Sequence, residues 1–380
     1  MQVNLWDLHH DKVYIKFKDD FHKEFFDKAI AYAGSQSKLA KLLSDSGENF
    51  SKNFKIDQQR ISFWLHNYMN LRLDVVLYLS DMIGIDKISI QNNLELLKGI
   101  GTSLPIKDPK LPFVLTPVMA NIIGKFICDG CILDSSHHYT STYNNICQEL
   151  IEEFIQEIKF AFGETQVDCP IVDGVIRARV TGFIGYIITN FFFFENGRKV
   201  PEIIKVSDRD IQCAFLRAVF DDEGTIHHKV NHIRVKMKYP MFLTDVMDML
   251  NKLGIQTSKL AIDKSKRFGR PLYYFVIYGK NNMILFHQLI DFTHPRKKQR
   301  LTEHINRPVK HVSYKPGETV KLIFNTLQER PMTANEIGNQ INRSKRTVQF
   351  FLDRLYKKRA VSWYPAKRKF VNEYVWQIAA

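Results

Sequence analysis

The sequence has little of several features that mark particular classes of protein. Its five cysteines are too few and too irregularly spaced for a disulfide framework, which favours a reducing, cytoplasmic setting. No apolar run reaches the roughly 18–20 residues of a membrane helix, and Met1–Lys12 lacks the apolar core of a secretory signal. No glycine-rich phosphate loop occurs, which excludes a motor driven through such a loop. Because 45% of the residues are hydrophobic, the chain can nevertheless bury real cores.

Acidic residues are scarce in only one part of the chain. Lys and Arg number 54 against 40 Asp and Glu, which gives a net charge of +14. Residues 306–380 hold 15 basic and 5 acidic side chains, a net charge of +10, whereas residues 1–107 and 108–305 carry +1 and +3. A strongly basic segment favours a polyanionic partner, most often nucleic acid. The shift in composition near residue 306 and the prolines between 105 and 112 predict three domains with these bounds.

A buried-helix pattern occurs twice in the central domain. Thr116 and Pro117 are suited to begin one helix, and Gly130 is suited to end it in the left-handed conformation. Ser207 is suited to begin a second helix, which Gly224 ends in the same way. The sequence therefore predicts two related helices at the start of two repeats, about residues 112–206 and 207–305.

Alignment of the two helix ends brings matching residues together. Asp129 pairs with Glu223, and Gly124 pairs with Ala218. Small residues at matching positions allow two helices to pack closely, so each helix is expected to deliver one carboxylate to a common site. Helix C-termini carry partial negative charge, and carboxylate oxygens are ligands for hard divalent cations.

The segments after each helix repeat as well. Polar turns and strand patterns are followed by helices at 147–162 and 240–253, then by strand patterns at 174–180 and 272–278. The predicted fold is α+β, with an α-β-β-α-β-β-α unit used twice about a pseudo-twofold axis. Each repeat is expected to form one antiparallel sheet, and the two sheets to form a saddle.

These residues carry a family resemblance. Ile122–Gly130 and Leu216–Gly224 resemble the signature helices of LAGLIDADG homing endonucleases in their single-chain, two-repeat form. Phe286–Leu301 resembles the closing segment of archaeal-type members, and Arg198–Ile204 resembles the segment before the second signature helix. The sequence departs from the pattern at Ile127, where the family usually has an acid.

The resemblance implies Mg²⁺-dependent (or Mn²⁺-dependent) cleavage of both strands of double-stranded DNA. Asp129 and Glu223 match the metal-binding acids and are implied to be catalytic. Lys297 or Lys298, and Lys236 or Arg234, are candidates for assisting catalysis in repeat two, and Arg177 or Arg179 in repeat one. The sheets are implied to read bases in the major groove with alternate side chains. The candidates for this contact are Arg177, Arg179, Arg234, Lys236 and Lys238.

The N-terminal domain, expected to be helical, resembles a repressor-type helix-turn-helix. Ser37–Leu43 is the candidate supporting helix, and Asp57–Leu65 is the candidate recognition helix. The first turn of the latter presents Gln58, Gln59 and Arg60 as DNA-contacting residues. An ordinary helical bundle is the alternative.

The C-terminal domain resembles a winged helix-turn-helix. Helices are expected at 319–329, 334–341 and 345–358, with Thr333 and Ser344 as N-caps, followed by strands at 361–364 and 374–378. The candidate DNA-contacting residues are Lys345, Arg346 and Gln349 on the third helix and Lys367, Arg368 and Lys369 on the hairpin.

Three functions remain open at this point. The first is a site-specific, freestanding DNA endonuclease, because no His-Asn pair of an intein ends the sequence. The second is a DNA-binding regulator that has lost cleavage, as in WhiA-type relatives, and the third is an RNA maturase. For the first we expect an intracellular, nucleoid-associated monomer that binds double-stranded DNA, with no membrane and no small-molecule cofactor.

Overall fold

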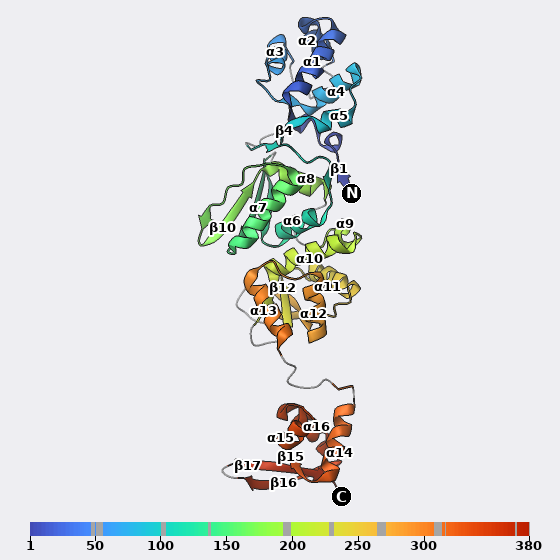
Figure 1. The fold of residues 1–380 in the computed structure, drawn as a ribbon, viewed down its shortest axis with the longest axis vertical. Helices are drawn as coiled ribbons and strands as arrows, with labels where there is room; N and C mark the ends of the chain where they lie inside the picture. Colours follow the sequence, from blue (N-terminus) through green and yellow to red (C-terminus); the bar gives the residue numbers. More distant parts are fainter. Residues whose placement is uncertain are drawn as a thin grey trace. The chain divides into compact units, whose positions relative to one another are not determined.

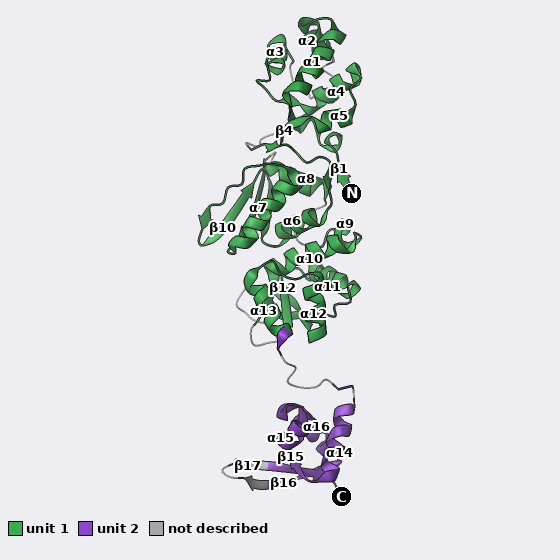
Figure 2. Cartoon of the chain, in the orientation of Figure 1, with its two compact units in different colours: residues 1–305 green, residues 306–380 purple. Residues whose placement is uncertain are grey.

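The computed structural model describes residues 1–380 with several gaps. These are 47–49, 51–55, 100–103, 136–137, 193–198, 228–231, 264–270, 308–313, 316, 369–370 and 380. The chain divides into two compact units, Met1–Ile305 and Asn306–Ala380 (Figure 2). Within the described ranges, no helix is both long and apolar enough to cross a membrane.

Two repeats with the same element order form most of the first unit (Figure 1). Repeat one consists of α6 (Pro117–Cys128), β7 (Gly130–Ser135), β8 (His138–Asn145), α7 (Gln148–Phe162), β9 (Ile171–Val172), β10 (Val175–Val180) and α8 (Gly182–Phe191). Repeat two consists of α10 (Arg209–Glu223), β11 (Gly224–Ile226), β12 (His232–Met237), α11 (Pro240–Lys252), β13 (Ala261–Asp263), β14 (Leu272–Tyr278) and α12 (Lys280–Leu289). The short helix α9 (Glu202–Lys205) precedes α10, and α13 (Pro295–Asn306) follows α12. The predicted α-β-β-α-β-β-α order is confirmed in both repeats.

Each repeat contributes one antiparallel sheet of the same topology. The strand orders are β7-β8-β10-β9 and β11-β12-β14-β13. Along β12 buried residues alternate with partly exposed ones, so one face of that sheet packs on the core and the other faces solvent. Two equivalent sheet faces are thereby presented by one chain.

The helices α6 and α10 pack directly against each other at their small residues. A Cβ atom added at Gly124 would lie 2.7 Å from the Ala218 Cβ and 3.1 Å from the Phe215 carbonyl oxygen. The expected close approach is therefore confirmed. The N-terminus of α6 is also as expected, with Pro117 in its first turn and the Thr116 side chain accepting a hydrogen bond from the Met119 N–H at 3.2 Å.

Two details of the helix ends differ from the prediction. Gly130 and Gly224 do not adopt the left-handed conformation, and Gly224 has φ −76°. Glycine is needed there for space, since an added Cβ would lie 2.4 Å from the preceding helical turn in both cases. The predicted N-cap Ser207 is wrong as well. Asp208 occupies the N-cap position without a side-chain bond, and the Ser207 hydroxyl donates to the Ile203 carbonyl.

The N-terminal part of the first unit is not purely helical. Its helices are α1 (Asp19–Ala33), α2 (Gln36–Asp45), α3 (Gln58–Leu65), α4 (Leu73–Ile83) and α5 (Lys87–Asn92), with short 3₁₀ turns at Leu5–Asp7 and His10–Lys12. A sheet of order β3-β2-β4-β5 joins them, made of β2 (Val13–Phe17), β3 (Leu71–Arg72), β4 (Leu94–Gly99) and β5 (Ile106–Lys107). Tertiary pairing explains this correction, because β2 finds its partners about 60 and 80 residues away, beyond the reach of a local pattern.

This N-terminal part is tied to repeat one by backbone pairing. Strand β1 (Gln2–Val3) pairs with β6 (Phe113–Val114), directly before α6. The Thr181 hydroxyl donates to the Leu104 carbonyl at 2.8 Å. Residues 1–107 and the repeats therefore share one compact unit.

The second unit has its own small core. It consists of α14 (Glu318–Glu329), β15 (Met332–Thr333), α15 (Ala334–Gln340), α16 (Lys345–Lys357), β16 (Val361–Arg368) and β17 (Val371–Ile378), with sheet order β15-β17-β16. Ile323, Val348 and Trp376 are among its buried residues. Thr333 and Ser344 cap α15 and α16 through their side chains, as predicted.

Candidate functional site

Two acidic residues lie at the C-terminal ends of the paired helices. Asp129 is the C-cap residue of α6, and Glu223 is the last residue of α10. Burial and the charge of Asp129 raise the pKa of Glu223 to about 7, and burial raises the pKa of Asp129. The ends of both helices add partial negative charge. Negative charge is therefore concentrated at one point between the repeats.

A half-buried lysine of α13, Lys297, lies against the end of α10. The Lys297 Nζ donates to the backbone carbonyls of Phe220 at 3.3 Å and Asp222 at 3.4 Å, and also to that of Asp221. Burial lowers the pKa of Lys297, while the nearby carboxylates, Glu223 among them, oppose that shift. The structure thus places the predicted Lys297 beside the acidic pair.

Asp221 determines where Lys297 lies. Its buried side chain accepts hydrogen bonds from the backbone N–H of Thr293 at 3.1 Å and of His294 at 2.9 Å, directly before α13. Burial raises the pKa of Asp221 to about 6, and these hydrogen bonds oppose the increase. Because the bonds tie the start of α13 to the end of α10, they hold Lys297 at the helix end.

A polar cluster on β8 connects the acids of the two repeats. The Asn145 Nδ2 donates to the Asp129 Oδ2 at 3.4 Å, to the Asp222 Oδ1 at 3.2 Å and to the Tyr143 hydroxyl oxygen at 3.1 Å. The Tyr143 hydroxyl donates to the same Asp222 oxygen at 2.7 Å. Sequence reasoning did not find Tyr143 and Asn145. One signal in the sequence could have identified them. Tyr143 and Asn145 are polar side chains at alternate, core-facing positions of β8.

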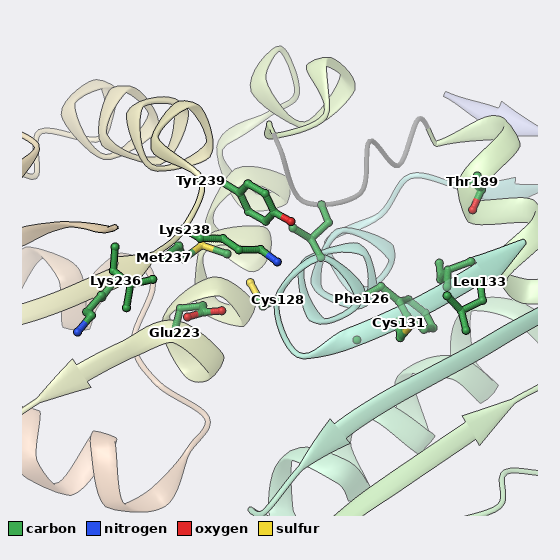
Figure 3. Close-up of a pocket in the computed structure, with 14 residues that line it drawn as sticks. Phe126, Cys128, Cys131, Leu133, Thr189, Glu223, Lys236, Met237, Lys238 and Tyr239 are labelled. Carbon is green, nitrogen blue, oxygen red and sulfur yellow. The ribbon is translucent and has the colours of Figure 1, made fainter. Parts of the chain in front are cut away.

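A cavity of about 970 Å³ opens beside these helix ends (Figure 3). Cys128 and Cys131 line it from repeat one, and Glu223, Lys238 and Tyr239 line it from repeat two. In Figure 3 the Lys238 side chain extends across the cavity toward Cys128, and the Glu223 carboxylate points into it. Cys128 is half-buried near three carboxylates, and its desolvation raises the pKa of its thiol well above the usual value.

Two of the other basic candidates are paired elsewhere. The Lys236 Nζ forms an ion pair with the Asp263 carboxylate at 2.6 Å, and its ammonium points away from Glu223 (Figure 3). The Lys298 Nζ pairs with the Asp291 carboxylate at 2.9 Å. The structure therefore brings Lys297 to the acids but directs Lys236 and Lys298 to other carboxylates.

The basic residues predicted on the sheets do alternate in strand register. Arg177 and Arg179 lie opposite Asn144 and Thr142 on β8, away from buried Ala178. In repeat two, Arg234 and Lys236 alternate with buried Ile233, Val235 and Met237 on β12, and exposed Lys238 follows the strand. The Arg234 guanidinium lies 4.0 Å from the ring centre of Tyr274 and pairs with Asp263. Both sheets thus present basic side chains on their outer faces.

Comparison with known families identifies the second repeat. Residues 210–291, from the start of α10 through α12, match the model of a LAGLIDADG-like domain. The second repeat is a LAGLIDADG-like domain. The matched segment contains Asp221, Glu223 and the whole second sheet.

Curated relatives match over a limited part of their length. The glutamine–fructose-6-phosphate aminotransferase of Methanocaldococcus jannaschii is 25% identical over 213 residues, which are 53% of this chain and 18% of that protein. The probable translation initiation factor IF-2 of Thermococcus kodakarensis is 29% identical over 123 residues, 32% of this chain and 10% of that protein. This chain therefore spans less than a fifth of the length of the curated relatives that it matches.

Solved structures of LAGLIDADG proteins are also similar. The homing endonuclease I-DmoI in complex with DNA and Mn aligns with a TM-score of 0.38 at 20% identity, covering 47% of this chain and 97% of that one. Full-length DUF199/WhiA from Thermatoga maritima aligns with a TM-score of 0.37 at 14% identity, covering 66% of this chain and 93% of that one.

The carboxylates at this site are of the donor type that a hard divalent cation takes. Asp129 and Glu223 offer carboxylate oxygens, and the Asp222 Oδ2 is shielded from solvent without a hydrogen-bond partner in the described part of the chain. No group of three or more His, Cys, Asp or Glu side chains is arranged around a metal position in that part. Magnesium suits such a site, because it keeps several waters and takes further ligands from substrate phosphates.

The candidates on the flanking helices lie at first turns. Gln58 and Gln59 are exposed at the start of α3, and Arg60 is partly buried, its N–H donating to the Asp57 N-cap at 2.8 Å. Lys345 and Arg346 are exposed at the start of α16, and the Gln349 amide donates to the Asp353 carboxylate at 2.8 Å. Lys367 and Arg368 lie on β16, and at these two positions only the backbone is described; Lys369 lies outside the described residues.

Proposed function

We propose that this protein is a site-specific endonuclease that hydrolyses phosphodiester bonds in both strands of double-stranded DNA and requires Mg²⁺ or Mn²⁺. The main support is the carboxylate pair, Asp129 and Glu223, at two packed helix ends flanked by two sheets with basic outer faces. A scissile phosphate needs charge neutralisation, which two acids alone do not supply and a bound cation does.

The site residues take separate parts in this proposal. Asp129 and Glu223 would hold the cation, which when bound neutralises phosphate charge and lowers the pKa of a water molecule. Lys297, fixed on the carbonyls at the end of α10, adds positive charge where negative charge develops on the phosphate. In the overall reaction the water oxygen bonds to phosphorus, a P–O bond of the DNA breaks, and the leaving oxygen takes up a proton from solvent.

The remaining basic residues serve recognition. Arg177 and Arg179 on one sheet, and Arg234, Lys236 and Lys238 on the other, alternate so as to reach base edges and phosphates along the major groove. Two repeats in one chain supply two half-sites, so a monomer suffices. We assign Lys236 to recognition rather than catalysis, because its ammonium is directed to Asp263.

The flanking parts extend the contact with DNA. Helices α2 and α3 would form a helix-turn-helix that presents Gln58, Gln59 and Arg60, and residues 306–380 would form a winged helix-turn-helix. The exposed positions of Lys345 and Arg346 in the first turn of α16 support the second assignment. The hairpin residues Lys367, Arg368 and Lys369 belong to the same proposal.

The test is cleavage of a randomised duplex library by the purified full-length protein. With Mg²⁺ we expect double-strand ends at one defined sequence, and with EDTA we expect intact DNA that is still bound. Mn²⁺ should restore cleavage after the chelator is removed. Sequence-specific binding without breaks in either metal would contradict the enzyme and favour the DNA-binding regulator. Preferential binding of a structured RNA would favour the maturase.

A further inference from the structure

An exposed aromatic cluster occupies one face of the β16–β17 hairpin in the second unit. Trp363 and Tyr374 lie with ring centres 4.5 Å apart at an interplanar angle of 71°, and the Tyr356 ring of α16 lies 6.4 Å from Trp363. The three side chains are 40%, 54% and 49% exposed, respectively. Trp376, paired with Trp363 across the hairpin, lies on the same face, is buried, and has its ring centre 6.2 Å from that of Tyr356. The buried ring anchors the cluster, and its outer rings stay accessible.

The geometry of the cluster leaves aromatic faces open. In an edge-to-face pair one ring presents its edge to its neighbour, so its own faces are not covered by that contact. Such open faces stack well on the flat faces of nucleic-acid bases, whatever their sequence. Bases inside a duplex already stack on each other, so only unpaired bases offer free faces to Trp363 and Tyr374.

Charge around the cluster favours a polyanion over another protein surface. Tyr356 is followed directly by Lys357, Lys358 and Arg359, all exposed at the end of α16. The unit as a whole carries a net charge of +10. Two copies of this surface would repel each other, whereas a phosphate backbone would be attracted to it.

We propose that the Tyr356–Trp363–Tyr374 cluster binds the unpaired bases of a single-stranded nucleic acid, with the adjacent basic run holding its backbone. This activity is separate from duplex cleavage at the LAGLIDADG core and does not depend on Asp129 or Glu223. The chemistry is shared by DNA and RNA strands, so both are tested.

The experiment measures binding of fluorescein-labelled dT15 and U15, with a 15-base-pair duplex as comparison, to the full-length protein. Trp64 and Trp376 are buried and Trp6 is partly buried, so Trp363 is the most exposed indole. We expect dT15 or U15 to quench its emission. Loss of one stacking ring weakens binding by roughly 5- to 150-fold, so Trp363→Ala and Tyr374→Ser should each fall in that range.

A conservative variant separates stacking from folding. Trp363→Phe keeps an aromatic face and should bind dT15 nearly as well by fluorescein anisotropy, while most of the quenching disappears. Tyr364→Ala is the matched control, because Tyr364 is 44% exposed but points to the opposite face of the same hairpin. It should leave binding unchanged.

Three results would overturn the proposal. The first is a wild-type protein that binds neither dT15 nor U15 at 0.1 M salt. The second is equal loss of affinity in Trp363→Ala and Tyr364→Ala. The third is concentration-dependent self-association in sedimentation that Trp363→Ala abolishes, which would make the cluster an interface between copies. If Trp363→Ala lowers the melting temperature of the protein, Tyr374→Ser decides the outcome.

Discussion

Gly124 on α6 lies so close to Ala218 on α10 that an added methyl group would come within 2.7 Å of the Ala218 Cβ. This contact sets how near the two helices approach, and so how near Asp129 and Glu223 come at their ends. Small side chains at both positions allow backbone to approach backbone. The contact is therefore the structural basis of the acidic pair.

Gly124→Ala should destabilise the first unit by about 1–3 kcal/mol, since a packed helix interface takes extra volume only with strain. Ala218→Gly in the same chain should recover part of that loss, because it removes the methyl group that the new Cβ would meet. The measurement is urea unfolding of the wild type, both single variants and the double variant. Additive effects of the two substitutions would show that these positions do not interact.

Asn145→Ala should lower the rate of DNA cleavage and raise the Mg²⁺ concentration needed for half-maximal rate, each by about 10–100-fold. Asn145 connects Asp129 to Asp222, so its loss frees the carboxylates to separate. Duplex binding in Ca²⁺ should change little. Asn251→Ala, at an exposed position of α11, is the control. If the cleavage rate fell while its dependence on Mg²⁺ concentration stayed the same, Asn145 would have a purely structural role.

Lys297→Ala should reduce the single-turnover cleavage rate by about 10²-fold, because it removes a fixed positive charge beside the reacting phosphate. Lys298→Ala removes the same charge one residue away, from a side chain that pairs with Asp291, and should have little effect on that rate. Both variants should bind the duplex within a few-fold of wild type. Equal effects on cleavage would show that position 297 has no special role.

Lys345→Ala and Arg346→Ala should make duplex binding less sensitive to salt. Each lost phosphate contact reduces the slope of log K against log salt concentration by about 0.9, since fewer counterions are released. Lys321→Ala, an exposed lysine of α14 in the same unit, is the charge-matched control and should leave the slope unchanged. An unchanged slope in all three variants would mean that the start of α16 does not contact DNA.

Local sequence patterns were sufficient to predict the repeats. Asp129 and Glu223 follow apolar helical segments that align at their glycines, and Gly124 and Ala218 match in that alignment. These features lie within single segments of chain, so one sequence displays them. The same holds for the caps at Thr116, Thr333 and Ser344, which depend on neighbouring residues only.

Contacts across the repeats were not predictable in the same way. Asn145 and Asp222 are 77 residues apart, and only the folded pair of helices brings them together. Lys236 and Lys238 both fit the alternating pattern in the sequence. In the structure Asp263, on β13 two strands away from β12, directs Lys236 away from Glu223. Strand β2 was missed because its partners, β3 and β4, lie far along the chain.

The central claim is that Asp129 and Glu223 hold the metal ion that DNA hydrolysis requires. The most direct measurement compares cleavage of the mapped target by wild type, Asp129→Asn and Glu223→Gln in Mg²⁺, with duplex binding in Ca²⁺ measured in parallel. The account predicts that each variant loses cleavage of at least one strand, and double-strand breaks altogether, while still binding the target. Double-strand cleavage at the wild-type rate in either variant would contradict it.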